Sequence, residues 1–189
     1  MQTFKQFLTE AANQQDADMK AFCEYVEEVT DDSYVLGTVW DSGVSYNAKN
    51  NTVEIKIAKE GDEDNINVDG KIVFTSPTEC VLDIEEWTAA GRVDDFEDKE
   101  VFDAEFDKLK KQGVKCLVDE DDFFVVWADV SKLRNRKLKF NAKEDLEELV
   151  EVFEEAREGS TMWEEGDVEE MIHAIDLSAL VKFCDAHRG

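Results

Sequence analysis

The chain of 189 residues is poor in the residues that usually build catalytic and metal sites. It has two histidines, one proline and four cysteines, and the cysteines form no Cys-x-x-Cys pair. Neither a zinc site nor a disulfide framework is therefore expected. The motifs of phosphate-binding loops, nucleophile elbows and zinc proteases are also absent. We expect no enzyme, no catalytic residue, no cofactor and no metal.

Long apolar runs and positive charge are scarce as well. No apolar stretch approaches the ~20 residues that span a bilayer, so no membrane partner is expected. Lys and Arg number 21 against 47 Asp and Glu, which gives a formal net charge of −26. Nucleic acids and anionic membranes attract basic residues, so this charge argues against binding either directly. A basic protein is the better partner, and a cytoplasmic or packaged location is expected.

Enough apolar residues are present for a folded core, because 42% of the chain is hydrophobic and 12 residues are Phe. Periods of three and four residues predict helices, and alternating β-branched runs between turn signals predict strands. Helices are expected over 15–30, 99–113, 143–158, 167–175 and 177–187. Strands are expected over 33–40, 51–58, 70–76 and 79–87, with two more inside 114–130. This order predicts an α+β fold with a mostly antiparallel sheet, flanking helices and a helical C-terminal region.

One segment imitates part of a calcium-binding loop. Asn65, Asn67, Asp69 and Gly70 match the early ligand spacing, but the twelfth position is Ser76 where such a loop has a bidentate glutamate. The flanking residues also favour strands, so a hairpin with an Asp69-Gly70 turn is expected instead.

The expected helix over 143–158 is the strongest sign of a binding surface. Its acidic residues are Glu144, Asp145, Glu147, Glu148, Glu151, Glu154, Glu155 and Glu158. Over about 24 Å of helix this gives roughly one carboxylate per 3 Å, close to the ~3.4 Å phosphate spacing of one B-DNA strand. Several of these acids are like-charged i,i+4 pairs, each of which costs helix stability. A surface that keeps them in spite of this cost favours a role for the charge.

Acidic turns extend the same character along the chain. One turn holds Asp62, Glu63 and Asp64, and another holds Asp119, Glu120, Asp121 and Asp122. If these groups share one side with the acidic helix, the surface would imitate a nucleic-acid backbone and occupy the basic groove of a DNA-handling protein.

A basic stretch over 131–143 interrupts this pattern with six Lys or Arg residues and no acid. Such a stretch can grip phosphate or an acidic partner. In a chain this acidic, neutralisation of neighbouring acids within the fold is the favoured alternative.

The first ten residues, MQTFKQFLTE, form a nearly neutral amphipathic segment. Met1, Thr3, Phe4, Phe7, Leu8 and Glu10 resemble the capsid-targeting peptide of internal, head-packaged proteins of T-even-type bacteriophages, and Gln2 departs from the lysine usual there. The resemblance implies cleavage between Glu10 and Ala11 by the prohead protease, docking of the leader on the phage scaffold, and injection with the genome. Some members of that family inhibit host restriction systems. An N-terminal helix docked on the domain is the alternative.

Together these observations predict a cleavable leader over 1–10 and one acidic α+β domain over 11–189. The expected function is a phage-encoded, anti-restriction or other anti-defence inhibitor, a DNA mimic that blocks a basic host nuclease. Its location would be the phage head and then the host cytoplasm. Two alternatives remain: an immunity-type or adaptor protein for one basic partner, and a small metal-dependent enzyme that uses paired carboxylates.

Overall fold

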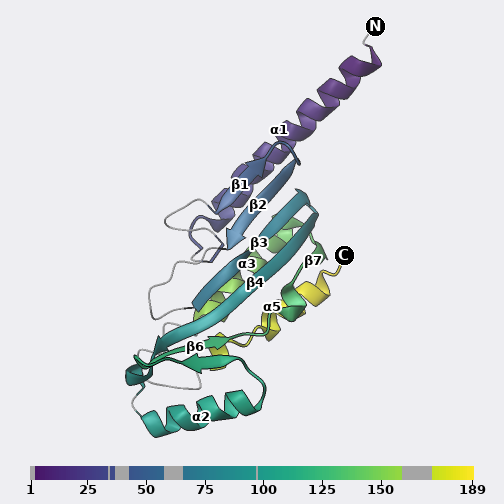
Figure 1. Cartoon of the computed structure of the whole chain (residues 1–189). Helices are drawn as coiled ribbons and strands as arrows, with labels where there is room; N and C mark the ends of the chain where they lie inside the picture. Colours follow the sequence, from purple (N-terminus) through teal and green to yellow (C-terminus); the bar gives the residue numbers. More distant parts are fainter. Residues whose placement is uncertain (1–2, 34, 37–42, 58–65, 97, 159–171) are drawn as a thin grey trace.

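A computed structural model of the chain describes residues 3–33, 35–36, 43–57, 66–96, 98–158 and 172–189 (Figure 1). Four named α-helices and seven strands lie in these ranges. The helices are α1 (Phe4–Thr30), α2 (Lys99–Lys111), α3 (Ala142–Glu158) and α5 (Ser178–Ala186). The strands are β1 (Val44–Asn47), β2 (Thr52–Ile57), β3 (Ile66–Ser76), β4 (Glu79–Arg92), β5 (Cys116–Val118), β6 (Phe123–Trp127) and β7 (Arg136–Lys139). Two short 3-10 turns are η1 (Val93–Asp95) and η2 (Ser131–Leu133).

The strands form one sheet in the order β1-β2-β3-β4-β6-β5, and β7 also pairs with β4. Each pairing between the named strands is antiparallel. The 14-residue β4 is long enough to pair with two strands along the same edge, because its first half pairs with β7 and its second half pairs with β6. The α+β class and the mostly antiparallel sheet with flanking helices are therefore confirmed.

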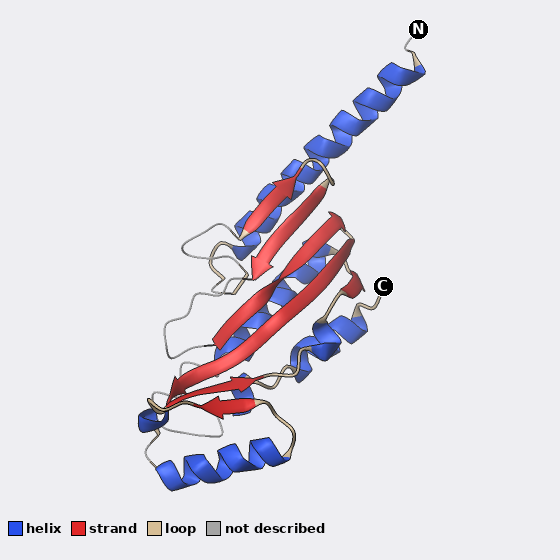
Figure 2. Cartoon of the chain, viewed as in Figure 1, coloured by secondary structure: helices blue, strands red, loops and turns tan. Residues whose placement is uncertain are grey.

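Helices α1 and α3 lie behind the sheet in Figure 2, and aromatic contacts join them to it. Phe22 of α1 meets Phe74 of β3 edge-to-face at 5.3 Å between ring centroids. Phe153 of α3 stacks on Trp87 of β4 at 6.1 Å. These rings belong to the buried core. Both helices are amphipathic, and their apolar stripes point toward the sheet because burial of apolar side chains is favourable.

The first helix is longer than the sequence predicts. Thr3 and Gln6 cap it reciprocally, because the Gln6 amide N–H donates to Thr3 Oγ1 and the Thr3 amide N–H donates to Gln6 Oε1. The expected leader and the expected helix over 15–30 are thus one continuous helix. Its first half, residues 4–15, projects beyond the sheet (Figure 1), and we name this segment the arm.

The arm leaves the body at Asp16. The Tyr46 hydroxyl of β1 donates a hydrogen bond to Asp16, and Lys20 pairs with the same carboxylate at 3.8 Å. Each described side chain from Thr3 to Gln15 is exposed, and the first buried one is Met19. The described side chains of the arm therefore do not pack on the body, whereas the second half of α1 does, so the alternative of a docked N-terminal helix holds for that half only.

Several local predictions need correction. The strand expected over 33–40 is wrong where it is described, since residues 35–36 form a turn, and residues 34 and 37–40 lie outside the described part. The sequence does not predict β1, because this strand has only four residues and they come directly after the turn signal Asp-Ser-Gly. Of the helix expected over 167–175, residues 172–174 are helical as predicted, and residues 167–171 lie outside the described part.

The predicted Asp69-Gly70 hairpin turn is wrong. Both residues lie inside β3, where the pairing with β4 shifts register. A Cβ on Gly70 would stand 2.6 Å from the Asp83 carbonyl oxygen, so glycine is needed here for a close strand contact at a bulge. The true hairpin turn follows Ser76.

Asn141 followed three residues later by Glu144 is a capping-box pattern, which predicts a helix start here. The structure confirms the position of this cap but not the partner. The Asn141 side-chain oxygen accepts from the Lys143 amide at 3.3 Å. The Asn141 amide N–H donates to Asp145 at 2.7 Å, and Glu144 is left at the surface. Asp145 therefore takes the capping role that the sequence pattern gives to Glu144, and the Glu144 side chain remains exposed.

Candidate acidic interface

Helix α3 separates its acidic and apolar residues on opposite faces. At about 100° per residue, Glu144, Glu147, Glu148, Glu151 and Glu155 fall within an arc of about 100°. All five side chains are exposed. The opposite arc holds the buried Leu146, Leu149 and Phe153. The apolar stripe that packs on the sheet therefore turns the five glutamates outward.

Two other acids of α3 have structural partners. Asp145 is half-buried and caps the helix start. Glu154 is half-buried and accepts a hydrogen bond of 2.6 Å from the Ser33 hydroxyl. Counting only the exposed glutamates between 144 and 155, the carboxylates recur about every 4 Å along the axis, somewhat less densely than B-DNA phosphates.

A second acidic row on α1 was not predicted. Glu24, Glu27, Glu28 and Asp31 are exposed and also lie within about 100° of helix surface. They recur about every 3.5 Å along the axis. The signal was present in the sequence, because acids at i, i+3, i+4 and i+7 mark one helix face, but the clustering of this row with α3 required the tertiary structure.

Two contacts place the rows side by side. The Tyr25 hydroxyl of α1 donates to the Ala142 carbonyl oxygen at 3.3 Å, at the start of α3. Ser33, just after α1, donates to Glu154 near the end of α3. Both helices therefore run in the same direction, and the carboxyl-terminal half of α1 lies beside α3.

The acidic rows affect the pKa values of two neighbouring residues on α1. Burial raises the pKa of Tyr25, and the negative charges of Glu147 on α3 and Glu28 on α1 raise it further. Burial likewise raises the pKa of the Cys23 thiol, with Glu27 and Glu24 adding to the effect. The pKa of one tyrosine is thus raised by acids of both helices, so the two rows form one negative region.

We define the acidic face as the exposed acids between residues 24 and 32 and between residues 144 and 155. No Lys or Arg occurs in 21–32 or 144–156, whereas twelve Asp or Glu do. The acidic face consists of Glu24, Glu27, Glu28, Asp31, Asp32, Glu144, Glu147, Glu148, Glu151 and Glu155. Glu158 ends α3, and its side chain lies outside the described part.

The predicted acidic turn over 119–122 lies elsewhere, between β5 and β6. Asp119 accepts from the amides of Asp121 and Phe123, both at 2.9 Å, and so shapes its own turn. Asp122 has a positive φ of 62° and pairs with Lys99 of α2 at 3.4 Å. Glu120 and Asp121 are exposed. This turn is anchored to α2, not to α3, and Asp62, Glu63 and Asp64 lie outside the described residues.

The basic stretch neutralises acids of the fold at two places, as favoured from the sequence. Arg134 donates to Asp83 at 2.7 Å, and the Asn135 amide donates to the same oxygen at 3.0 Å. Arg136 of β7 pairs with Asp185 of α5. Burial alone would raise the pKa of Asp83, but the Arg134 and Asn135 hydrogen bonds and the charges of Arg134 and Lys71 lower it.

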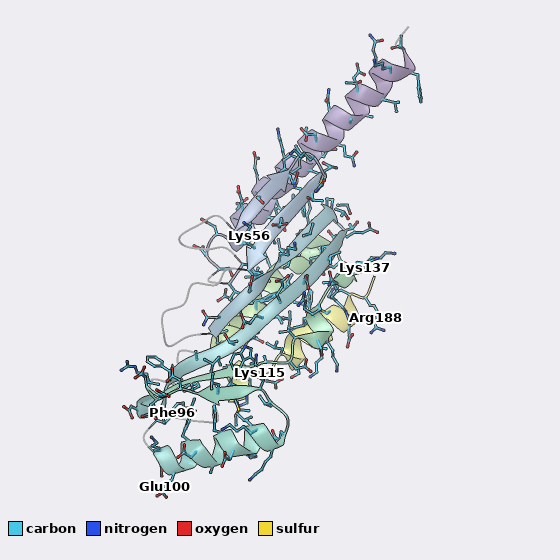
Figure 3. The ribbon with its side chains drawn as sticks, in the orientation of Figure 1. Lys56, Phe96, Glu100, Lys115, Lys137 and Arg188 are labelled. Carbon is cyan, nitrogen blue, oxygen red and sulfur yellow. The ribbon has the colours of Figure 1, made fainter. Side chains whose placement is uncertain are left out.

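Four further cations, Lys56, Lys71, Lys137 and Lys139, lie on the sheet face that points away from the helices. Lys56 of β2 stands opposite Lys71 of β3, and Lys71 stands opposite Asp83 of β4. Lys137 and Lys139 of β7 are exposed on the same face; Figure 3 marks Lys56 and Lys137. The charge is therefore uneven: residues 21–32 and 144–156 carry only negative groups, whereas this face of the sheet carries both signs.

The residues of the expected processing site lie on the arm. Leu8 is 51% exposed, and Glu10 and Ala11 are exposed too. All three precede Asp16, where the contacts of α1 with the body begin.

Neither a metal centre nor a redox site is found in the described ranges. No group of three or more His, Cys, Asp or Glu side chains there could hold a metal ion. Cys23, Cys80, Cys116 and Cys184 are all free thiols. Cys184 is buried, and His187 is half-buried and stacks on Phe183.

Two further observations bear on what the chain is. No helix in the described part of the chain is long and apolar enough to cross a membrane. Comparisons with protein-family models, with curated proteins and with solved structures give no match to this chain.

Proposed function

We propose that the protein is a non-enzymatic inhibitor whose acidic face imitates nucleic acid and occupies the basic groove of a DNA-handling protein. The observation that carries this proposal is the pair of adjacent acidic rows on α1 and α3, with no Lys or Arg within 21–32 or 144–156. Fixed helices hold these carboxylates at spacings near those of phosphates. A protein whose basic groove binds a polyanion would be electrostatically complementary to this face as well.

The proposed target is a basic host nuclease, restriction enzyme or other defence protein of a bacterium, and the proposed source is a bacteriophage. The arm supports this part, because its leader-like residues are exposed and separate from the folded body. In this proposal the prohead protease cuts after Glu10 in the phage head. Since Lys5 and Glu10 leave together, the cut does not change the net charge of the remaining chain.

The test compares two variants of equal charge in capturing proteins from bacterial lysate. The first carries Glu147→Gln, Glu148→Gln, Glu151→Gln and Glu155→Gln on the acidic face. The control carries Glu100→Gln, Asp103→Asn, Asp107→Asn and Asp121→Asn, all at exposed sites outside it. We expect the first to lose the captured protein and the control to keep it.

Competition with DNA separates imitation from the adaptor alternative. A nucleic-acid mimic should be displaced by duplex DNA, and its affinity should fall steeply between about 50 and 200 mM salt. A captured protein that holds DNA and this chain at the same time would rule imitation out and favour the adaptor.

A further inference from the structure

The arm presents an apolar stripe that continues the core stripe of α1. Phe4 and Leu8 are 77% and 51% exposed, although large apolar side chains are normally buried. At about 100° per residue they lie on the same side of the helix as Met19, Phe22 and Val26, which are buried against the sheet. The packing face of α1 therefore extends about 18 Å beyond its own sheet.

The arm also differs from the rest of the chain in charge. Residues 3–15 contain one Lys and one Glu, so the arm is neutral while the whole chain carries −26. A membrane surface is a poor occupant, because the arm has a single cation and anionic lipids would repel the body.

Side-chain size changes along the stripe in a way that suits a second copy. The large Phe4 and Leu8 occupy its start, and the small Ala11 and Ala12 occupy its end. In an antiparallel pair of arms the large residues of one copy meet the small residues of the other, with Leu8 opposite Ala11 of the second copy. A parallel pair would instead set large against large and leave gaps beside the alanines, which costs packing energy.

The antiparallel arrangement also limits charge repulsion. With Phe4 opposite Gln15 of the second copy, the two Asp16 residues, where the bodies begin, stand about 20 Å apart along the helix axes. This exceeds the Debye length of about 8 Å at physiological salt, so the repulsion between two acidic bodies is largely screened.

From the continuous stripe, its graded side-chain sizes and its neutrality, we propose that the arm is a self-association site that pairs with the arm of a second copy in an antiparallel, two-fold arrangement. The interface is small, so the dimer is weak and depends on concentration. If the chain is cut after Glu10, Phe4 and Leu8 are removed and the dimer becomes a monomer.

Sedimentation equilibrium of the full chain, from about 1 µM to about 1 mM, tests this proposal. Phe4→Glu with Leu8→Glu should raise the dimer dissociation constant by about 100-fold or more, because both copies lose their anchors. The matched control, Gln6→Glu with Asn13→Glu, adds the same charge on the opposite side of the arm and should change it less than about threefold. Gln6→Glu keeps the cap of α1, since glutamate serves equally at that position.

Two more readouts keep the outcome clear. Higher salt should strengthen the dimer, because it screens two like-charged bodies, whereas it should weaken binding through the acidic face. Small-angle scattering should show an elongated dimer with the bodies at opposite ends. A chain that stays monomeric throughout, a dimer insensitive to Phe4 and Leu8, or a compact dimer would each overturn the proposal. The function proposed above is unaffected by any of these results.

Discussion

Reversing the charge of Glu151 should make the protein more stable. Glu151 is exposed in the middle of α3 and has Glu147 four residues before it and Glu155 four residues after it. Each like-charged i,i+4 pair costs about 0.2–0.5 kcal/mol, and each opposite pair contributes a similar amount. Glu151→Lys converts both pairs, so the free energy of unfolding should rise by about 1–2 kcal/mol at low salt.

Thermal and urea unfolding measure this gain. For a chain of this length, the melting temperature should rise by about 2–4 °C for each kcal/mol. In about 1 M salt the Debye length falls to about 3 Å, and most of the gain should disappear. The same substitution should weaken capture of the basic partner, so stability and binding would change in opposite directions.

Asp103→Lys in α2 is the matched control. It makes the same charge change at an exposed helical site, but its i,i+4 neighbours are Lys99 and Asp107, so the pair energies cancel. Any salt-dependent increase in the free energy of unfolding of this control is therefore due to the smaller net charge of the chain and not to neighbouring pairs. If Glu151→Lys gains no more than this control, or if its gain survives in high salt, local repulsion on the acidic face is refuted.

Other predictions concern the sheet and the arm. Asp83→Asn should cost about 1–3 kcal/mol at neutral pH, because it removes the charge of an acceptor shared by Arg134 and the Asn135 amide. The pKa of Asp83 is lowered in the folded state, so its contribution to the free energy of unfolding is present above the ordinary value of 3.8 and is lost as pH falls through the lower folded value. Urea unfolding should therefore show that the stabilities of the natural protein and of Asp83→Asn differ at neutral pH and converge in acid. Gly70→Ala should lower the melting temperature, since the added Cβ would stand 2.6 Å from a backbone oxygen that cannot move aside. Deletion of residues 1–10 should leave the free energy of unfolding of the monomer unchanged within about 0.5 kcal/mol, because the described side chains of this segment are exposed; a larger loss would show that the arm supports the body.

Local patterns identified much of the secondary structure. The acids and leucines of α3 repeat at helical spacing, and the two strands around the acidic turn over 119–122 alternate as strands do. The apolar face of α3 also dictated that its glutamates point outward. Both signals depend on neighbours a few residues apart, which any sequence displays directly.

Contacts between distant residues decided the rest. The sequence determined that α1 and α3 are acidic helices, but only the tertiary structure set them side by side, through Tyr25 and Ala142, 117 residues apart. The bulge at Gly70 and the pairing of β7 with β4 likewise depend on which strands meet. A local pattern fixes which face of an element is apolar, whereas the choice of what covers that face depends on the packing of the whole chain.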